Sequence, residues 1–471
     1  MKLLSCICMT AILYTQACAN NPTTATEQRV PVKNTVVAAP AARPDSFAIG
    51  KVIDTITCAA DAGQSYAAYI PSTGNKKALP VIYFFDPHAS GSLPLNKYKA
   101  LADKYGFLLI GSNNSKNGND WQLTEAIWQI LSDDTRKRFN INQQRIYTAG
   151  FSGGAKVAGF AALNHSEIKG VIANGAGLPD GATAGNYAFS FTAITGEGDM
   201  NMTDLVAISK EFDKTNTRHR LMLFNGKHEW APEKTMDVAF AGFQFDAMRN
   251  KLLPVNEAFI KSFVANSKKT VETYTKENNL LKAVAECVLA GNLVSGLSSD
   301  ANWFSGKATA LSNQEAYKKQ EQERQQLLVT EQNIKAKYAQ QFNQGDMEYW
   351  KKEIADLQTK AKAATAEGAM YQRLLAYLSL AFYSFSNQLV GNHRDVGAEY
   401  YVNLYKMADP TNSEAWYFSA ILHARLNDLP GVEADLLKAV ECGFNDKARM
   451  RSQNDFVERG IDFGKIERGM K

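Results

Sequence analysis

Short apolar segments that alternate with helix-like stretches constrain the fold of this 471-residue chain more than any other feature. Residues 81–85 are continuously apolar, which is typical of a strand buried on both faces of a sheet. Further strands are expected at residues 65–71, 107–110, 145–149, 170–173, 191–194 and 221–224. Strands alternating with helices predict an α/β fold over residues 46–250, with a mostly parallel sheet covered on both faces.

The sequence changes in character after about residue 253, where helical patterns begin to dominate. Residues 251–365 predict a helical region, and the part from 315 onward, rich in Gln, Lys, Glu and Ala, indicates a solvated helix. Residues 366–471 predict a second all-helical part. Within it, residues 395–445 pair two helices after an Asp-Pro step and so resemble the tetratricopeptide repeat. Such repeats imply a surface for a protein partner; a plain helical bundle is the alternative.

The composition narrows the class of protein. Hydrophobic residues make up 45% and charged residues 21%, which is ordinary for a globular protein and excludes a mainly disordered chain. The formal net charge of +4 is small and is not gathered into long basic runs, so no nucleic acid is expected as a partner.

The first residues predict export. A lysine at position 2, an apolar run over residues 3–14 and small residues around Cys18 indicate a signal peptide over residues 1–17. In one reading, Ala17-Cys18 ends a bacterial lipoprotein box and Cys18 carries lipid. In the other, Ala17-Cys18-Ala19 is a cleavage site that releases a soluble protein.

The segment after Cys18 favours the lipoprotein. Residues 18–45 are rich in Thr, Ala, Pro and Asn and predict a flexible linker. The expected location is the periplasm or the cell surface, with the lipid anchor as the only membrane contact. A soluble periplasmic or secreted protein is the alternative.

Metal and cofactor chemistry finds no sequence signal. The chain has no phosphate-binding loop, no H-E-x-x-H zinc helix and no paired C-x-x-C, so neither a metal nor a cofactor is expected. Besides Cys18, the mature chain would keep Cys58, Cys287 and Cys442, whose wide spacing predicts buried thiols and at most one disulfide.

The strongest chemical signal is Gly150-Phe151-Ser152-Gly153-Gly154, which matches G-x-S-x-G. It directly follows the predicted strand at 145–149 and precedes a helix of small residues at 155–160. A strand that turns sharply into a helix lifts the serine hydroxyl clear of the sheet, and the helix N-terminus directs N–H groups at a developing oxyanion. Ser152 is the candidate nucleophile; a Gly-rich turn with an incidental serine is the alternative.

A nucleophilic serine needs a base and an acid. His228 is the candidate base, because it follows the predicted strand at 221–224 and can reach over the serine. Asp199, after the strand at 191–194, is the candidate acid, with Asp204 and Glu197 as nearby alternatives. The chain order Ser152, Asp199, His228 is that of the α/β-hydrolases.

Over residues 46–250 the chain thus resembles the α/β-hydrolase family, and within it the secreted esterases of the polyhydroxybutyrate-depolymerase and feruloyl-esterase type. The resemblance rests on residues 145–154, on Gly-Glu-Gly-Asp at 196–199 and on Gly-Lys-His-Glu-Trp at 226–230. In that family a His-Gly pair after the third strand supplies part of the oxyanion hole. Here the corresponding loop is residues 86–91, Asp-Pro-His-Ala-Ser-Gly, which departs from the pattern. The resemblance implies Gly153 and either His88 or Ala89 as oxyanion donors.

These features predict an exported serine hydrolase, of the carboxylesterase type, that acts through an acyl-enzyme on a small-molecule or polymer-borne ester. One alternative is a serine peptidase, because fold and triad do not separate esters from amides. Another is a repeat-containing scaffold lipoprotein with a vestigial hydrolase domain. Trp121 and Trp230 are candidates to line the substrate pocket, although either residue fits a core position equally well.

Overall fold

The computed structural model describes residues 47–74, 77–342 and 344–470. The predicted signal peptide, Cys18 and the whole predicted linker over residues 18–45 lie outside these residues, so export and lipidation stay predictions. Across the described ranges, no helix has both the length and the apolar character needed to cross a membrane.

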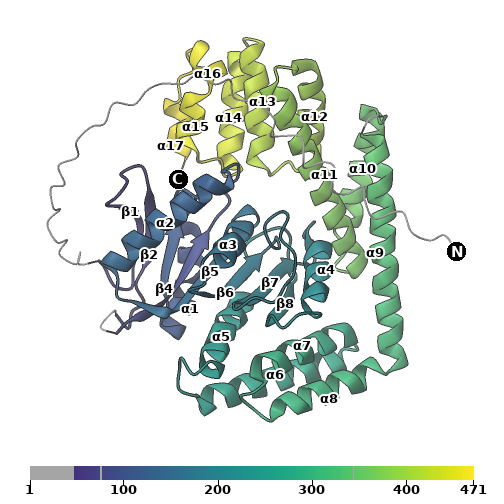
Figure 1. Ribbon diagram of the computed structural model, residues 1–471. Helices are drawn as coiled ribbons and strands as arrows, with labels where there is room; N and C mark the ends of the chain where they lie inside the picture. Colours follow the sequence, from purple (N-terminus) through teal and green to yellow (C-terminus); the bar gives the residue numbers. More distant parts are fainter. Residues whose placement is uncertain (1–46, 75–76, 343, 471) are drawn as a thin grey trace, which may run out of the picture. The chain divides into compact units, whose positions relative to one another are not determined.

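An eight-stranded sheet forms the first part of the described chain (Figure 1). Its strand order is β1-β2-β4-β3-β5-β6-β7-β8. β2 is antiparallel to both of its neighbours, and all pairs from β4 to β8 are parallel, which confirms the predicted mostly parallel sheet. The strands are β1 (Val52–Thr57), β2 (Ser65–Tyr69), β3 (Leu79–Phe85), β4 (Leu108–Ser112), β5 (Ile141–Phe151), β6 (Ile168–Asn174), β7 (Ser190–Gly196) and β8 (His219–Phe224).

Two strand features differ from the sequence prediction. The prediction misses β1, because this edge strand buries only Ile56 and therefore lacks an apolar run. β5 begins at Ile141 rather than at Arg145. Ile141 pairs with Leu79 of β3 and the register shifts before Ile146, while the polar residues between them interrupt the apolar pattern.

Helices cover both faces of the sheet. On β3 the alternation is visible: Tyr83 joins a core with Trp128 of α2, whereas Phe84 joins a second core with Tyr98 of α1 and Phe240 of α5. The first core also contains residues of α3 and α4. The helices of this part are α1 (Ser92–Tyr105), α2 (Trp121–Arg138), α3 (Gly153–Asn164), α4 (Met202–Phe212) and α5 (Glu233–Arg249).

The rest of the described chain is helical, as predicted (Figure 1, teal to yellow). One core joins α6–α8 to α5, and another joins the helices from α9 onward. These helices are α6 (Glu257–Lys276), α7 (Leu280–Val294), α8 (Asp300–Ser312), α9 (Glu315–Gln341), α10 (Met347–Lys360), α11 (Ala366–Gly391), α12 (Asp395–Ala408), α13 (Ser413–Arg425), α14 (Leu429–Glu441), α15 (Lys447–Ser452), α16 (Asn454–Glu458) and α17 (Gly464–Gly469). Pairs such as α13 with α14 pack together, while their assignment to the tetratricopeptide type stays a prediction.

The long helix α9 is less uniformly solvated than its composition suggests. Most of its residues are at least partly exposed, but Glu331 and Tyr338 are fully buried. Glu331 pairs there with Arg373 of α11, and Tyr338 donates a hydrogen bond to Glu353 of α10 at 2.7 Å. A polar composition cannot reveal this burial, because the partners come from other helices.

We expect that residues 46–250 do not form a stable, active fragment by themselves. Phe245 and Met248 of α5 are buried against Ile260 of α6 and Leu293 of α7, so removing these helices would expose an apolar face. Limited proteolysis followed by activity measurement tests this expectation. A stable fragment that ends near residue 250 and keeps full activity would contradict it.

Candidate active site

Ser152 lies on a sharp turn between β5 and α3. Its backbone has φ 54° and ψ −122°, a strained conformation for a residue other than glycine. Flanking glycines make the turn sterically feasible. A Cβ atom at Gly150 would collide with the Gly154 carbonyl, and one at Gly154 would collide with the carbonyl of Phe85 on β3. This strained serine at the end of a central strand has the geometry of a nucleophile elbow.

His228 lies within hydrogen-bonding distance of both Ser152 and Asp199. His228 Nε2 is 2.9 Å from Ser152 Oγ, and His228 Nδ1 is 3.0 Å from both carboxylate oxygens of Asp199. Asp199 is fully buried, whereas the His228 side chain keeps 20% of its exposure. The serine and the imidazole are thus accessible from solvent while the carboxylate is enclosed.

The neighbouring carboxylates occupy other places. Asp204 lies in the first turn of α4, with its residue exposed to solvent. The Glu197 side chain pairs with Lys282 of α7 at 2.8 Å. Of the three acids considered from the sequence, Asp199 is therefore the one that the fold brings to His228.

Two asparagines that the sequence analysis did not single out hold Asp199 and the loop of residues 225–232, which carries His228 and is called the histidine loop below. Asn174, at the end of β6, accepts a hydrogen bond from the Ala231 N–H at 2.7 Å and donates to the Glu229 carbonyl at 3.2 Å. The backbone N–H of Asn201 donates to Asp199 Oδ1 at 2.9 Å. The available signal for Asn174 was a polar residue directly after the strand predicted at residues 170–173, because ligands and reacting groups gather at the carboxyl ends of such strands.

The loop after β3, which carries the predicted donors His88 and Ala89, is tied down by Asp86. Its buried carboxylate accepts hydrogen bonds from the His88 N–H and from Trp230 Nε1, both at 2.9 Å. Burial alone would raise the pKa of Asp86, but the hydrogen bonds from His88 and Trp230 outweigh it and lower the pKa. The Ala89 N–H donates to the Asp86 carbonyl at 3.1 Å. Both predicted donors from this loop are engaged within it, and Trp230 acts as a link between loops.

Gly153 begins α3, where backbone N–H groups have no partner within the helix. Its neighbour is Asn117: a Cβ atom at Gly153 would collide with Asn117 Oδ1. The Asn117 N–H donates to the Pro87 carbonyl at 2.9 Å, so this loop also borders the segment after β3. Trp121, further along, is exposed and stacks on Phe160 of α3 with ring centroids 4.7 Å apart.

The other histidines make contacts elsewhere. His165 pairs with Glu125 at 3.0 Å, and His219 pairs with Asp213 at 3.1 Å. His423, in the helical part, pairs with an aspartate of the following turn. His88 lies beside Asp86 and His393 lines a cavity of the helical part, whereas His228 contacts Ser152.

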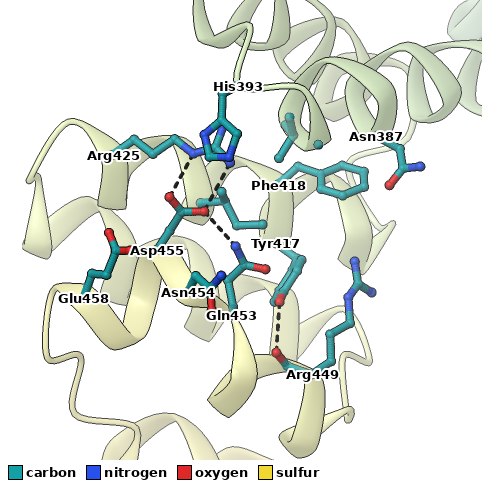
Figure 2. A pocket seen from close by; sticks show the side chains of 13 residues that line it. Asn387, His393, Tyr417, Phe418, Arg425, Arg449, Gln453, Asn454, Asp455 and Glu458 are labelled. Carbon is teal, nitrogen blue, oxygen red and sulfur yellow. Dashed lines mark hydrogen bonds and ion pairs between the residues drawn. The ribbon is translucent and has the colours of Figure 1, made fainter. Parts of the chain in front are cut away.

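A cavity of about 390 Å³ lies among α11, α13, α15 and α16 (Figure 2). Ser152, Asp199 and His228 do not line it. Three of its charged side chains, Arg425, Arg449 and Asp455, already have partners. Arg425 pairs with Asp455 at 3.0 Å, and Arg449 pairs with Glu414 at 2.7 Å. The cavity is therefore separate from the Ser152 site.

Within the described residues we find no candidate metal site and no reactive thiol. There, no group of three or more His, Cys, Asp or Glu side chains is arranged to hold a metal ion. Cys58 and Cys287 are buried free thiols, and burial raises the pKa of each to about 11. Cys442 is a partly exposed free thiol.

Comparisons with known proteins return solved structures of hydrolases. A fluorophosphonate-binding serine hydrolase of Staphylococcus aureus with bound substrate is 13% identical, with 38% of this chain and 92% of that chain covered and a TM-score of 0.32. An esterase of Pyrobaculum calidifontis is 13% identical, with 43% and 85% covered and a TM-score of 0.34. A thermostable carboxylesterase from a metagenomic library is 12% identical, with 42% and 90% covered and a TM-score of 0.36. No family model and no curated protein matches the sequence.

The topology itself defines the class of fold. The strand order, the antiparallel β2 at one side of an otherwise parallel sheet, and the serine elbow after β5 are those of an α/β-hydrolase fold. A long all-helical region follows it.

Proposed function

We propose that this protein is a serine hydrolase that cleaves carboxylic esters. The observation that carries the proposal is the 2.9 Å contact between Ser152 Oγ and His228 Nε2, on a strained elbow, with Asp199 on the other imidazole nitrogen. A nucleophile, a base within hydrogen-bonding reach and a group that orients the base together define nucleophilic acyl transfer.

The proposed reaction proceeds through an acyl-enzyme. Ser152 Oγ attacks the ester carbonyl carbon as His228 Nε2 takes the hydroxyl proton. His228 then gives this proton to the leaving alcohol as the ester C–O bond breaks. A water molecule attacks the acyl carbonyl carbon as His228 takes its proton. His228 then returns this proton to Ser152 Oγ as the bond between Oγ and the acyl carbon breaks and the carboxylic acid leaves. Asp199 accepts the Nδ1–H hydrogen bond and stabilises the imidazolium.

The negative oxygen of the tetrahedral intermediate needs donors close to Ser152. The N–H of Gly153 is the proposed first donor. His88 or Ala89 would become the second donor only after its N–H turns away from Asp86, with which both residues are hydrogen bonded. Asn117 borders the same place, with its amide oxygen nearer to Gly153 than its NH₂ group.

Hydrolysis of p-nitrophenyl acetate tests the proposal, with a peptide p-nitroanilide as the comparison. An esterase releases p-nitrophenol rapidly and p-nitroaniline slowly, whereas a peptidase cleaves both. If the protein cleaves neither substrate and is not labelled by a fluorophosphonate probe, the result would favour the scaffold protein with a vestigial hydrolase domain.

We further propose that lipid on Cys18 anchors the mature protein, with residues 20–45 as a tether. A flexible coil of about 26 residues has a root-mean-square span of roughly 25–30 Å, which would keep the enzyme close to the membrane surface. In a bacterium with lipoprotein processing, we expect the wild type to fractionate with membranes and Cys18→Ala to be soluble. A soluble wild-type protein whose intact mass corresponds to a start at Asn20 without lipid would favour the secreted alternative.

A further inference from the structure

The turn that carries Asp199 is held by the sheet on one of its sides. β7 ends at Gly196, and the next residues form a tight turn in which the Asp199 N–H donates to the Gly196 carbonyl at 3.1 Å. The Glu197 N–H donates to the Phe224 carbonyl at 2.8 Å, and the Gly198 N–H donates to a carbonyl in the histidine loop at 2.9 Å. We call residues 196–199 the acid turn.

On another side the acid turn contacts a buried ion pair of the helical region. Arg373 of α11 donates from Nη1 to the Glu197 carbonyl at 2.6 Å and from Nε to Glu331 Oε2 of α9 at 2.8 Å. Both charged residues are nearly inaccessible, with 4% and 0% exposure. Lys335 adds a second cation to Glu331 at 2.7 Å. The planar guanidinium therefore joins two helices to the backbone two residues before Asp199.

A second observation shows how closely α11 approaches this turn. A Cβ atom at Gly198 would collide with Oε1 of Gln372, the residue before Arg373. The Gln372 amide donates to the Ala361 carbonyl at 3.0 Å, so its side chain is itself held. The tightest of the contacts that favour glycine at 198 therefore comes from α11, and a weaker one comes from the Gly226 carbonyl.

The other cation at the acid turn is less well placed to hold it. Lys282 pairs with the Glu197 carboxylate, but their side chains are 43% and 29% exposed. Exposed pairs of this kind contribute little, because solvent screens the charges and both side chains lose conformational freedom. Arg373 binds the backbone itself and is buried, so it restricts the position of the turn more directly.

We propose that Arg373 is a positioning residue, which holds the acid turn against α9 and α11 so that Asp199 faces His228. The proposal rests on the proposed function, in which Asp199 orients the catalytic base. Its physical basis is that a displacement of about 1 Å in a catalytic group can lower a rate by about 100-fold. The helical region would then be part of the catalytic unit.

The kinetic test compares Arg373→Gln with Arg425→Gln in the full-length protein. Arg425 is a matched control, because it also belongs to a largely buried ion pair of the helical region but does not touch the acid turn. We expect Arg373→Gln to lower kcat by about 10- to 100-fold with KM changed by less than about threefold. We expect Arg425→Gln to keep kcat within about twofold, as for a site remote from the chemistry.

The kcat of Arg373→Gln and of Arg425→Gln is then measured in protein that also carries Asp199→Asn. If Arg373 acts through Asp199, Arg373→Gln should lower kcat by less than about twofold further, because the residue it positions is already disabled. An equal loss in both backgrounds would show a merely structural role and overturn the proposal. Unchanged kcat in Arg373→Gln alone would overturn it too.

A second variant covers the case that Arg373→Gln does not fold. Gly198→Ala places a Cβ atom against Gln372 Oε1, whose amide is hydrogen bonded to the Ala361 carbonyl, while the Arg373–Glu331 pair keeps its residues. It should lower kcat, and adding Gln372→Ala, which removes the colliding atoms, should restore at least part of the loss. Failure of both effects would contradict positioning by α11.

A spectroscopic measurement separates this proposal from the proposed function. In protein labelled with ¹⁵N-histidine, the Nδ1 proton of His228, assigned through its loss in His228→Gln, reports the hydrogen bond to Asp199. Arg373→Gln should shift or remove this signal, and Arg425→Gln should keep it. If the shift occurs in a protein without hydrolase activity, the positioning stands and the proposed function fails. If the protein hydrolyses esters but Arg373→Gln leaves the signal unchanged, the positioning proposal fails and the proposed function stands.

Discussion

Ser152→Ala is expected to lower kcat for ester hydrolysis by on the order of 10⁴-fold or more, because it removes the atom that would form the acyl-enzyme. The fold should persist, since alanine loses only the hydroxyl oxygen that contacts His228. Steady-state kinetics with p-nitrophenyl acetate and circular dichroism measure the two effects.

Ser166→Ala is a suitable control for this variant. Ser166 is exposed and follows α3 closely, so its loss should leave kcat and probe labelling unchanged. A fluorophosphonate probe should label the wild type and the control but not Ser152→Ala. Mass-spectrometric localisation of the probe on another residue would show that Ser152 is not the nucleophile.

Asp199→Asn is expected to lower kcat by about 10⁴-fold with little change in substrate binding. An amide at this buried position favours the wrong histidine tautomer, because its NH₂ group would donate to Nδ1, which must itself carry the proton. The measurement is kcat and KM at neutral pH, together with a thermal melt to confirm folding.

Asp204→Asn is the matched comparison, since it makes the same chemical change five residues away on the exposed first turn of α4. It should alter kcat by no more than about twofold, because its side chain is exposed and the carboxylate that contacts His228 is that of Asp199. A large loss in Asp204→Asn combined with a small loss in Asp199→Asn would mean that the wrong carboxylate has been assigned.

Hydrophobic patterning was sufficient to predict the central strands but not the edge of the sheet. β3 is buried at every position and reads as an apolar run, whereas β1 exposes most of its residues and carries no such run. A strand can be recognised from a continuous apolar sequence only where both of its faces are covered and its side chains are buried. At an edge, backbone hydrogen bonds to one neighbour decide the structure.

The candidate site could be predicted in part for a similar reason. Ser152 lies in a local motif whose strand, turn and helix are contiguous in the chain, and Gly150 and Gly154 mark the close approach of its backbone. The contacts of Asn174 and Asn117 could not be predicted, because each depends on loops that come together only in the folded protein.

The sequence by itself determined the alternation of strands and helices, the elbow at Ser152 and the order of serine, acid and histidine, because these are properties of neighbouring residues. Only the tertiary structure decided which carboxylate meets His228, since Asp199, Asp204 and Glu197 lie within eight positions of one another. It also placed Glu331 in the interior beside Arg373. Contacts between residues far apart in the chain arise from packing of whole elements, and local composition carries no record of them.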